Sequence, residues 1–251
     1  MSSKARLVLA GALLALVSAP ALAVEVVLGF TSLPSAQGWT YSADGVNVPG
    51  TGTGTNNDVP ETTVFSLSGG VLHMDTVNTG VGFQSAGSNT YSLPVDIDPS
   101  LPFTMEMTAR VTAEAHFQAA NQNNFFGFFF AARTGDVQYS IGLGPANVQN
   151  SDGTTIAFDN TSFHDYRLEA TPGAPGPDFQ LYIDDVLRLS DDPRAVLDVS
   201  RLLFGDGTGG TNAVADITAF RFFQAALVPE PGSLALLGVA FAGMGFGRRR
   251  K

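Results

Sequence analysis

Asp96 and Asp98 form the tidiest pair of carboxylates with two-residue spacing in the sequence. Glycoside hydrolysis uses two carboxyl groups that flank the scissile bond, and alternate residues of a β-strand share one face. Pro94 and Pro99 enclose the pair, however, and favour a loop over a strand. Solvated surface carboxylates are therefore the favoured interpretation of Asp96 and Asp98, and a catalytic pair is the alternative.

Three histidines, His73, His116 and His164, are the candidate general bases. His164 shares strand parity with Tyr166 and Leu168, which favours a hydrogen-bonded structural histidine over a base. The nucleophile-elbow pattern G-x-S-x-G does not occur in the sequence. No hydrolase triad is therefore predicted.

A glycine-rich loop with oxygen-bearing side chains runs from Asp206 to Asn212, and Asp216 lies four residues further on. Calcium takes oxygen ligands from flexible loops, and extracellular modules bind it weakly. The loop does not match the register of an EF-hand, and the preference of Asp and Asn for turns explains these residues equally well. Asp206, Asn212 and Asp216 are candidate Ca²⁺ ligands, with ordinary turn residues as the alternative.

Trp39, Tyr139 and Tyr182 are candidate platforms for sugar rings. Aromatic faces stack on sugars when they are exposed in a groove. Core packing or a loop plug is the alternative for each of them, because aromatic side chains bury large areas.

The segments that must position these residues have the pattern of β-strands. Apolar and polar residues alternate from Thr104 to Ala113, which predicts a half-buried strand. The continuous apolar run from Phe125 to Ala132 predicts a strand covered on both faces, paired through a turn with a strand from Val137 to Leu143. Further short strands are expected at Val26–Phe30, Thr63–Leu67, Val71–Asp75, Phe163–Ala170, Phe179–Leu189, Arg201–Phe204 and Ile217–Phe223. The predicted fold is all-β, an antiparallel two-sheet sandwich or jelly roll of about a dozen strands.

Charge narrows the range of partners. Between Val24 and Val228 there are seven arginines and 22 acidic residues, so this part of the chain has a net charge of −15. Such a surface repels phosphate backbones and anionic lipid headgroups, and nucleic acid is not an expected partner. Metal cations are favoured instead. The chain has no cysteine, which excludes disulfides, a thiolate nucleophile and Cys-ligated zinc.

The first 23 residues have the organisation of a secretory signal peptide. Lys4 and Arg6 precede an apolar run from Leu7 to Val17, and the small residues that end at Ala23 fit the A-x-A pattern. We expect export by the Sec machinery and cleavage by signal peptidase after Ala23. A buried N-terminal helix is the alternative.

The last 24 residues combine a rigid motif, an apolar stretch and a basic end. In order, they are Pro229-Glu230-Pro231, the uncharged segment from Ser233 to Phe246, and Arg248, Arg249, Arg250 and Lys251. As a single hydrophobic helix the 14-residue segment rises about 21 Å, short of the ~30 Å hydrocarbon core, so it is a marginal membrane span. The basic end is expected on the cytoplasmic side. A permanent tail anchor is the alternative to a segment that is removed.

This C-terminal arrangement resembles the PEP-CTERM sorting signal of Gram-negative envelope proteins. The resemblance implies processing by an exosortase, transient anchoring in the inner membrane, and association with exopolysaccharide or biofilm-matrix systems. It covers about a tenth of the chain.

Between the two ends, several phrases are similar to the concanavalin A-like lectin/glucanase fold: residues 70–75, 163–169, 179–185 and 204–206, with Arg221-Phe222. This resemblance implies a two-sheet jelly roll with a concave face that often binds glycans. The Glu-x-Asp-x-x-Glu pattern common in glycanases of this fold is absent from the sequence.

Three parts are therefore expected: a signal peptide (1–23), a concanavalin A-like β-sandwich (24–227) and a PEP-CTERM sorting segment (228–251). The favoured function is that of a non-enzymatic cell-surface or matrix protein that binds polysaccharide. A glycoside hydrolase or lyase with an atypical acidic pair, and a purely structural matrix protein, are the alternatives.

Overall fold

The computed structural model describes residues 23–43, 59–78, 89–116, 127–173, 175–196, 198–207 and 211–225. All of them lie in one unit, Ala23–Ala225. The segment before Ala23, the Pro229-Glu230-Pro231 motif, the apolar segment and the basic end lie outside the described residues. Within the described ranges, no helix has the length and apolar character needed to cross a membrane.

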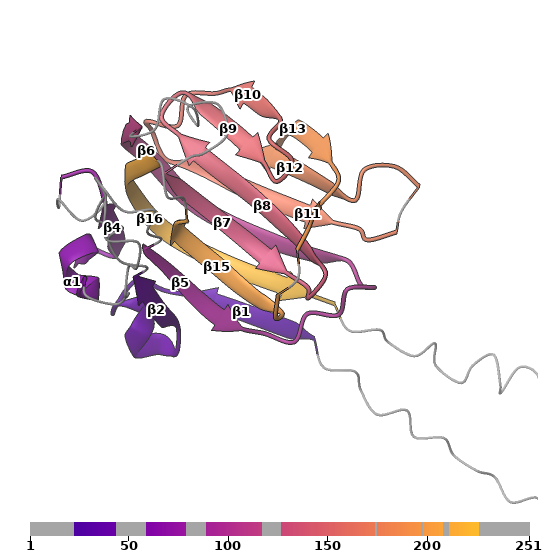
Figure 1. The fold of residues 1–251 in the computed structure, drawn as a ribbon, viewed down its shortest axis with the longest axis horizontal. Coiled ribbons are helices and arrows are strands. Elements are labelled where there is room, and N and C mark those ends of the chain that lie inside the picture. Colours follow the sequence, from indigo (N-terminus) through magenta and orange to yellow (C-terminus); the bar gives the residue numbers. More distant parts are fainter. Residues whose placement is uncertain are drawn as a thin grey trace, which may run out of the picture. The chain divides into compact units, whose positions relative to one another are not determined.

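Sheet A has eight strands, with the two long strands β6 and β16 side by side at its centre (Figure 1). Its strands in spatial order are β13 (Val186–Asp191), β12 (Phe179–Ile183), β11 (His164–Ala170), β6 (Phe103–His116), β16 (Thr211–Gln224), β4 (Val71–Asp75) and β3 (Phe65–Ser68), and β1 (Val24–Leu28) pairs with β16. Buried and half-buried residues alternate along β6 from Phe103 to Val111, as the sequence pattern predicts.

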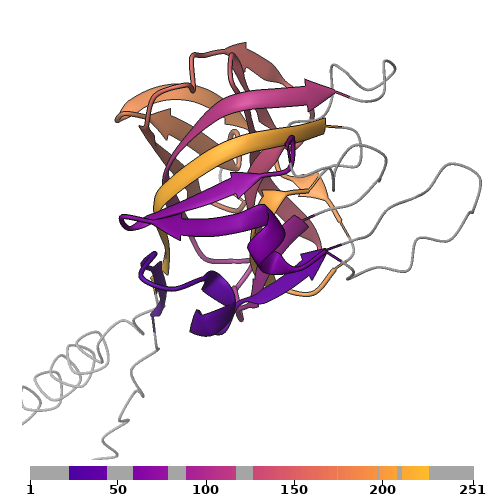
Figure 2. The same cartoon turned by 90° about the vertical axis from the view of Figure 1, so that its left-hand side faces the viewer.

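Sheet B also has eight strands and forms the second layer of the sandwich, which Figure 2 shows from the side. In spatial order they are β10 (Thr155–Ala157), β9 (Asn147–Asn150), β8 (Val137–Gly144), β7 (Phe128–Arg133), β15 (Arg201–Asp206), β5 (Asn89–Pro94) and β2 (Thr40–Ala43), and β14 (Arg194–Ala195) pairs with β8. The strand pairs of both sheets are antiparallel. Two short helices, η1 (Pro34–Gln37) and α1 (Glu61–Val64), complete the described elements.

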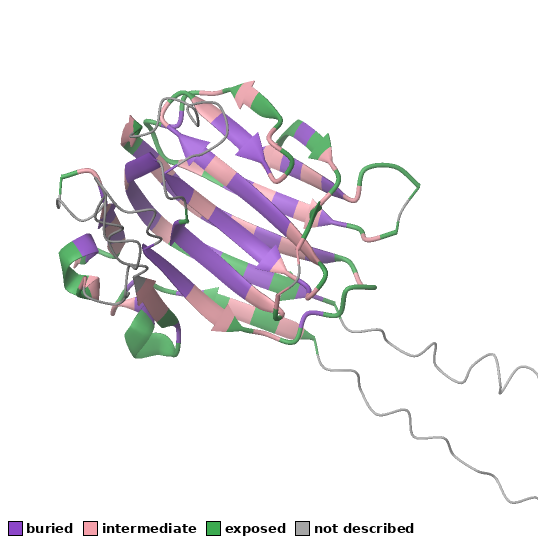
Figure 3. Cartoon of the chain, in the orientation of Figure 1, coloured by how far each residue is buried: buried purple, intermediate pink, exposed green. Residues whose placement is uncertain are grey.

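The core lies between the sheets and is rich in aromatic rings, as the buried strand centres in Figure 3 show. Trp39 links the two layers, because its ring contacts Phe204 of β15 at 5.1 Å and Phe220 of β16 at 5.4 Å between centroids. Tyr139 of β8 packs in the same way on Phe103 of β6 at 5.1 Å. The two-sheet antiparallel sandwich expected from the sequence is confirmed.

Strand β7 corrects one expectation. The apolar run predicts cover on both faces, but Phe128 and Phe130 pack in the core while Phe129 and Arg133 lie half-buried on the opposite, outer face of sheet B. Continuous hydrophobicity misleads here because Phe129 is an apolar residue on an open face. This outer face carries the candidate site.

The hairpin between β12 and β13 turns through Asp184 and Asp185, both with a left-handed backbone, φ 51° and 62°. Positive φ at both central residues is the mark of a type I′ turn, and Asp tolerates it better than most residues. The strand expected from Phe179 to Leu189 is therefore two strands. Residues 63 and 64 are helical in α1 rather than extended, and sequence pattern did not predict β2, β5, β9 and β10.

Candidate functional site

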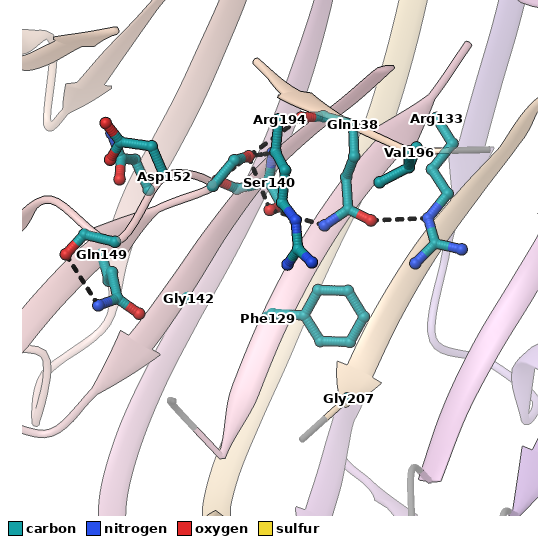
Figure 4. Close-up of a pocket in the computed structure, with 13 residues that line it drawn as sticks. Phe129, Arg133, Gln138, Ser140, Gly142, Gln149, Asp152, Arg194, Val196 and Gly207 are labelled. Carbon is teal, nitrogen blue, oxygen red and sulfur yellow. Dashed lines mark hydrogen bonds between the residues drawn. The ribbon is translucent and has the colours of Figure 1, made fainter. Parts of the chain in front are cut away.

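A groove of about 650 Å³ lies on the outer face of sheet B (Figure 4). Its volume falls within the range of small-molecule sites, roughly 300–1,000 Å³. Strands β7, β8, β9 and β14 supply most of the lining, which comprises Phe129, Arg133, Gln138, Ser140, Gly142, Gln149, Asn150, Ser151, Asp152, Gly153, Arg194, Val196 and Gly207. Strand register arranges the outward-facing part of this lining in rows across the sheet.

The first row places one aromatic ring between glycines. Phe129 of β7 pairs with Gly205 of β15 on one side and with Gly142 of β8 on the other, and Gly142 pairs in turn with Gln149 of β9. Glycine has no side chain, so neither neighbour in this row covers the ring. Phe129, which is half-buried, therefore presents part of its ring to the groove.

Two glycines near Phe129 are required for different reasons. A Cβ on Gly207 would lie 2.1 Å from Cε1 of Phe129, so the ring packs against the backbone at Gly207. Gly205 has φ +132°, and a Cβ there would lie 2.4 Å from the backbone oxygen of Asn89. Gly207 therefore sets the position of the ring, whereas Gly205 is required by the backbone of sheet B.

The second row is small and hydrogen-bonded. Ala131 of β7 pairs with Ser140 of β8. The Ser140 backbone N–H donates to Ser151 Oγ at 2.8 Å, and the two hydroxyl oxygens lie 2.9 Å apart. Gln138 Nε2 donates to Ser140 Oγ at 2.9 Å. This network fixes the polar side chains of the floor before any ligand arrives.

The third row carries positive charge. Register aligns Arg201 of β15, Arg133 of β7, Gln138 of β8 and Arg194 of β14 across four strands. Arg133 Nε donates to Gln138 Oε1 at 2.7 Å, and Arg133 and Arg201 both pair with Asp198 Oδ2. Burial, together with repulsion from Arg201 and Arg194, lowers the pKa of Arg133 to about 10.

One carboxylate lies at the far rim. Asp152 Oδ1 accepts a hydrogen bond from the Thr154 backbone N–H at 2.7 Å, and this bond lowers the Asp152 pKa. Asp191 neighbours it, and its pKa is raised by burial and by the Asp152 charge. Among the described lining residues, Asp152 is the one with a carboxyl group.

The three candidate calcium ligands are not brought together as a cation site. Asp216 on β16 binds Arg110 Nη2 at 2.7 Å through Oδ2 and lies 2.6 Å from His73 Nδ1 through Oδ1. Asn212 donates to the Thr76 backbone oxygen at 2.6 Å, and Asp206 is buried at the end of β15 in sheet B. The described residues contain no cluster of three or more His, Cys, Asp or Glu side chains suited to a metal ion. Among the described residues, which leave out 208–210 of the predicted loop, Asp206, Asn212 and Asp216 therefore do not share one site.

Two of the three candidate sugar platforms lie in the core. Trp39 and Tyr139 are only 4% and 2% exposed, so their rings cannot reach a ligand. The expectation that they stack on sugars does not hold. Tyr182 lies on the outer face of sheet A, where the Arg167 guanidinium covers its ring at 4.3 Å and its hydroxyl donates to Gln180. Core packing therefore describes Trp39 and Tyr139, while for Tyr182, which lies outside the core, stacking on a sugar stays a prediction.

The three histidines and Asp98 have structural partners, whereas Asp96 is exposed. His73 lies against Asp216, His164 Nδ1 lies 2.7 Å from Asp184 Oδ2, and His116 Nε2 lies 3.1 Å from Glu114 Oε2. Asp98 follows β5 in a segment without regular structure. Its carboxylate accepts two hydrogen bonds from Ser100, which lower the Asp98 pKa.

Sequence reasoning missed Phe129, Gln138 and Arg194. The available signal was the glycine content of the neighbouring strands, in particular Gly142, Gly205 and Gly207. Gly142 and Gly205 reveal their role only when the strand register places them beside Phe129, and Gly207 only when the fold brings its backbone against the ring.

Among solved structures, the chain is similar to an endo-1,3-beta-glucanase from Streptomyces sioyaensis, with 14% identity and a TM-score of 0.48 over 83% of this chain and 100% of that chain. It is also similar to the metal-free form of lectin I-B4 from Griffonia simplicifolia, with 12% identity and a TM-score of 0.44 over 80% of this chain and 99% of that chain. A third is the botulinum neurotoxin serotype D binding domain, with 12% identity and a TM-score of 0.41 over 69% of this chain. This chain spans 44% of that third chain's length. No curated protein sequence matches the chain.

The family comparison concerns the C-terminal segment. Residues 227–251 match the model of the PEP-CTERM protein-sorting motif. The matched residues include Pro229-Glu230-Pro231, the apolar segment and the basic end, so the resemblance seen in the sequence is confirmed. The chain carries a PEP-CTERM protein-sorting motif over residues 227–251.

Proposed function

We propose that this protein is exported across the inner membrane of a Gram-negative bacterium, sorted by an exosortase through its PEP-CTERM motif, and binds extracellular polysaccharide in the groove of sheet B without cleaving it. The motif supports the sorting step. The groove supports the binding step. After processing, the protein belongs at the cell surface or in the extracellular matrix.

The observation that carries the binding proposal is the half-buried ring of Phe129, which lies between Gly205 and Gly142 on the groove floor. The apolar face of a sugar ring packs well on an aromatic surface that side chains leave open. Glycine neighbours provide that opening, and the strand pairing on both sides holds the ring in place.

The polar residues next to Phe129 suit the hydroxyl groups of a sugar. A carboxamide carries two donor hydrogens and two acceptor positions. Gln138 uses one donor toward Ser140 and one acceptor toward Arg133, which leaves one of each for a ligand. Because the network holds Gln138 in place, a ligand gains these hydrogen bonds at little ordering cost.

Binding without cleavage is supported by the carboxyl groups of the groove. Retaining and inverting glycosidases use two carboxyl groups, one on each side of the scissile bond. Asp152 is the carboxylate among the described lining residues, and it lies at one end of the groove. Reducing-end release from a panel of acidic and neutral exopolysaccharides tests this directly, since a binding module releases none.

Binding is tested with the exported protein and the same panel by affinity electrophoresis. Phe129→Ala should weaken binding roughly tenfold or more, as the loss of a central aromatic contact does. Phe223→Ala is the matched control, because Phe223 is 39% exposed on β16 of the other sheet. Equal binding by both variants would contradict the groove assignment, and no binding by the unmodified protein would favour the purely structural alternative.

Sorting is tested with Glu230→Ala in a host that has an exosortase and in one that lacks it. The proposal expects the unmodified tail to be removed only in the first host. Equal trimming in both hosts would show that another protease processes the tail.

A further inference from the structure

The third row of the groove is electrostatically unusual for this protein. Residues 24–228 contain seven arginines, and three of them, Arg133, Arg194 and Arg201, lie in one row across sheet B. Like charges directly opposite each other on neighbouring strands destabilise a sheet. Arg133 and Arg201 are such a pair. Residues 24–228 have a net charge of −15, so acidic residues are plentiful in this part of the chain. Arg133 and Arg201 are nevertheless direct neighbours.

Asp198 offsets only part of this charge. Its Oδ2 atom pairs with both Arg133 and Arg201, so one negative charge faces two positive charges. Arg194 is exposed and has no ion pair among the described residues. Burial, followed by repulsion from Arg201 and Arg194, lowers the pKa of Arg133. The row thus keeps an excess of positive charge beside the groove.

The side chains carry this charge into the groove. Arg133 and Arg194 both line it, and Figure 4 shows their guanidinium groups extending from the row toward the side on which Phe129 lies. Guanidinium groups bind carboxylate and sulfate oxygens with two parallel hydrogen bonds. Gln138 lies between the two arginines in the row. It holds Arg133 in place, because Gln138 Oε1 accepts a hydrogen bond from Arg133 Nε.

We infer that Arg133 and Arg194 form a subsite for an anionic sugar, a residue that carries a carboxylate or a sulfate ester, next to the ring that stacks on Phe129. This inference rests on the proposed polysaccharide function and names its ligand class. The anion supplies the counter-charge that Asp198 does not, so the arrangement is stabilised when the ligand is bound.

The acidity of the rest of the domain does not oppose this assignment. Charges more than about 10 Å away are largely screened at 0.1 M ionic strength, whereas partly buried charges in contact with a ligand are screened much less. Nucleic acid is a poorer fit, because duplex DNA carries one charge per roughly 1.7 Å and must face the acidic surroundings as well as the groove.

The test compares matched pairs of polymers that differ only in charge, using isothermal titration calorimetry on the exported protein. The pairs are polygalacturonate with its carboxyl-reduced form, and dextran sulfate with dextran. At least one anionic polymer should bind roughly tenfold more tightly than its neutral partner, the effect of one or two charge-assisted hydrogen bonds. The pair that shows this preference tells whether the anion is a carboxylate or a sulfate. Duplex DNA serves as a further arm, and tighter binding of DNA than of either anionic polymer would overturn the inference.

Arg194→Gln should abolish the preference for the anionic polymer. Arg221→Gln is the control, because it removes the same charge from the outer face of sheet A, where Arg221 pairs with Glu25. Equal affinity for anionic and neutral polymers, or equal effects of the two variants, would overturn the inference. If neutral polymers bind as tightly and Phe129→Ala still weakens binding, the polysaccharide function stands while the anion subsite falls. If no polymer binds, both fall.

Discussion

Arg133 and Arg201 are direct register partners on strands β7 and β15, and both pair with the same oxygen of Asp198. Asp198 also anchors the chain after β14, because its backbone N–H donates to the Gly135 oxygen at 3.0 Å. Asp198 thus holds two arginines through its carboxylate and the turn at Gly135 through its backbone N–H. The Asp198 carboxylate therefore affects both the stability of the arginine row and its net charge.

Asp198→Asn should destabilise the fold. It leaves two facing guanidinium groups without a counter-charge, at an expected cost of about 2 kcal/mol given that the Asp198 side chain is only 22% exposed. Chemical denaturation at neutral pH measures the loss. Asp185→Asn is the control, because the 91% exposed Asp185 side chain pairs with Arg167 at the surface and should contribute less than ~0.5 kcal/mol. Equal losses would show that Asp198 does not relieve repulsion.

Glu114 should make the protein less stable as pH rises. Burial raises the pKa of Glu114 above its ordinary value of 4.5, so the folded state holds this proton more tightly than the unfolded state. Stability therefore falls as pH rises from 4.5 through the raised value, because the unfolded chain releases the proton first. Glu114→Gln keeps an acceptor for the Gly127 N–H and should flatten the curve in this window. A variant with an unchanged slope from pH 4 to 7 would contradict this source of pH dependence.

Two glycine substitutions should separate binding from folding. Gly207→Ala directs a methyl group at the Phe129 ring, so it should weaken polysaccharide binding with little change in melting temperature. Gly205→Ala conflicts with a backbone at φ +132° and with the Asn89 oxygen, and should cost about 1–3 kcal/mol of stability. Thermal melts and affinity electrophoresis on both variants decide the matter. Equal melting temperatures of Gly207→Ala and Gly205→Ala would contradict the different roles assigned to the two glycines.

Trp39→Ala should be far more destabilising than Phe129→Ala. The Trp39 ring fills the space between Phe204 and Phe220, so its removal should cost about 3–5 kcal/mol. Phe129 lies on the outer face and loses less burial on truncation. Urea midpoints of the two variants measure the difference. Similar midpoints would place Phe129 in a packed interior rather than on an open groove floor.

Strands were predictable from the sequence where apolar and polar residues alternate clearly. Alternation from Thr104 to Ala113 correctly predicts β6, because one face of that strand packs in the core and the other does not. The PEP-CTERM motif was also recognisable from order alone, since Pro229-Glu230-Pro231, the apolar segment and the arginines each have a distinct chemistry.

The site was not predictable, for two physical reasons. An aromatic residue fits a core and a sugar platform equally well. The sequence alone therefore does not distinguish Trp39 and Tyr139, which are buried, from Phe129, which is partly open. The arginine row forms between strands that are up to about 70 residues apart in sequence, and register alone brings Arg133 and Arg201 together. Nothing local to either residue marks it as part of a site.

Under the proposed function, polysaccharide occupies the groove of sheet B. The decisive measurement is an NMR titration of the exported protein with an oligosaccharide that binds it. The chemical shifts of the backbone amides are followed during the titration. The shifted amides should cluster at Phe129, Gly142 and Arg194, on strands β7, β8 and β14 of one sheet face. Shifts that cluster instead around Arg167 and Arg221 on sheet A would contradict it.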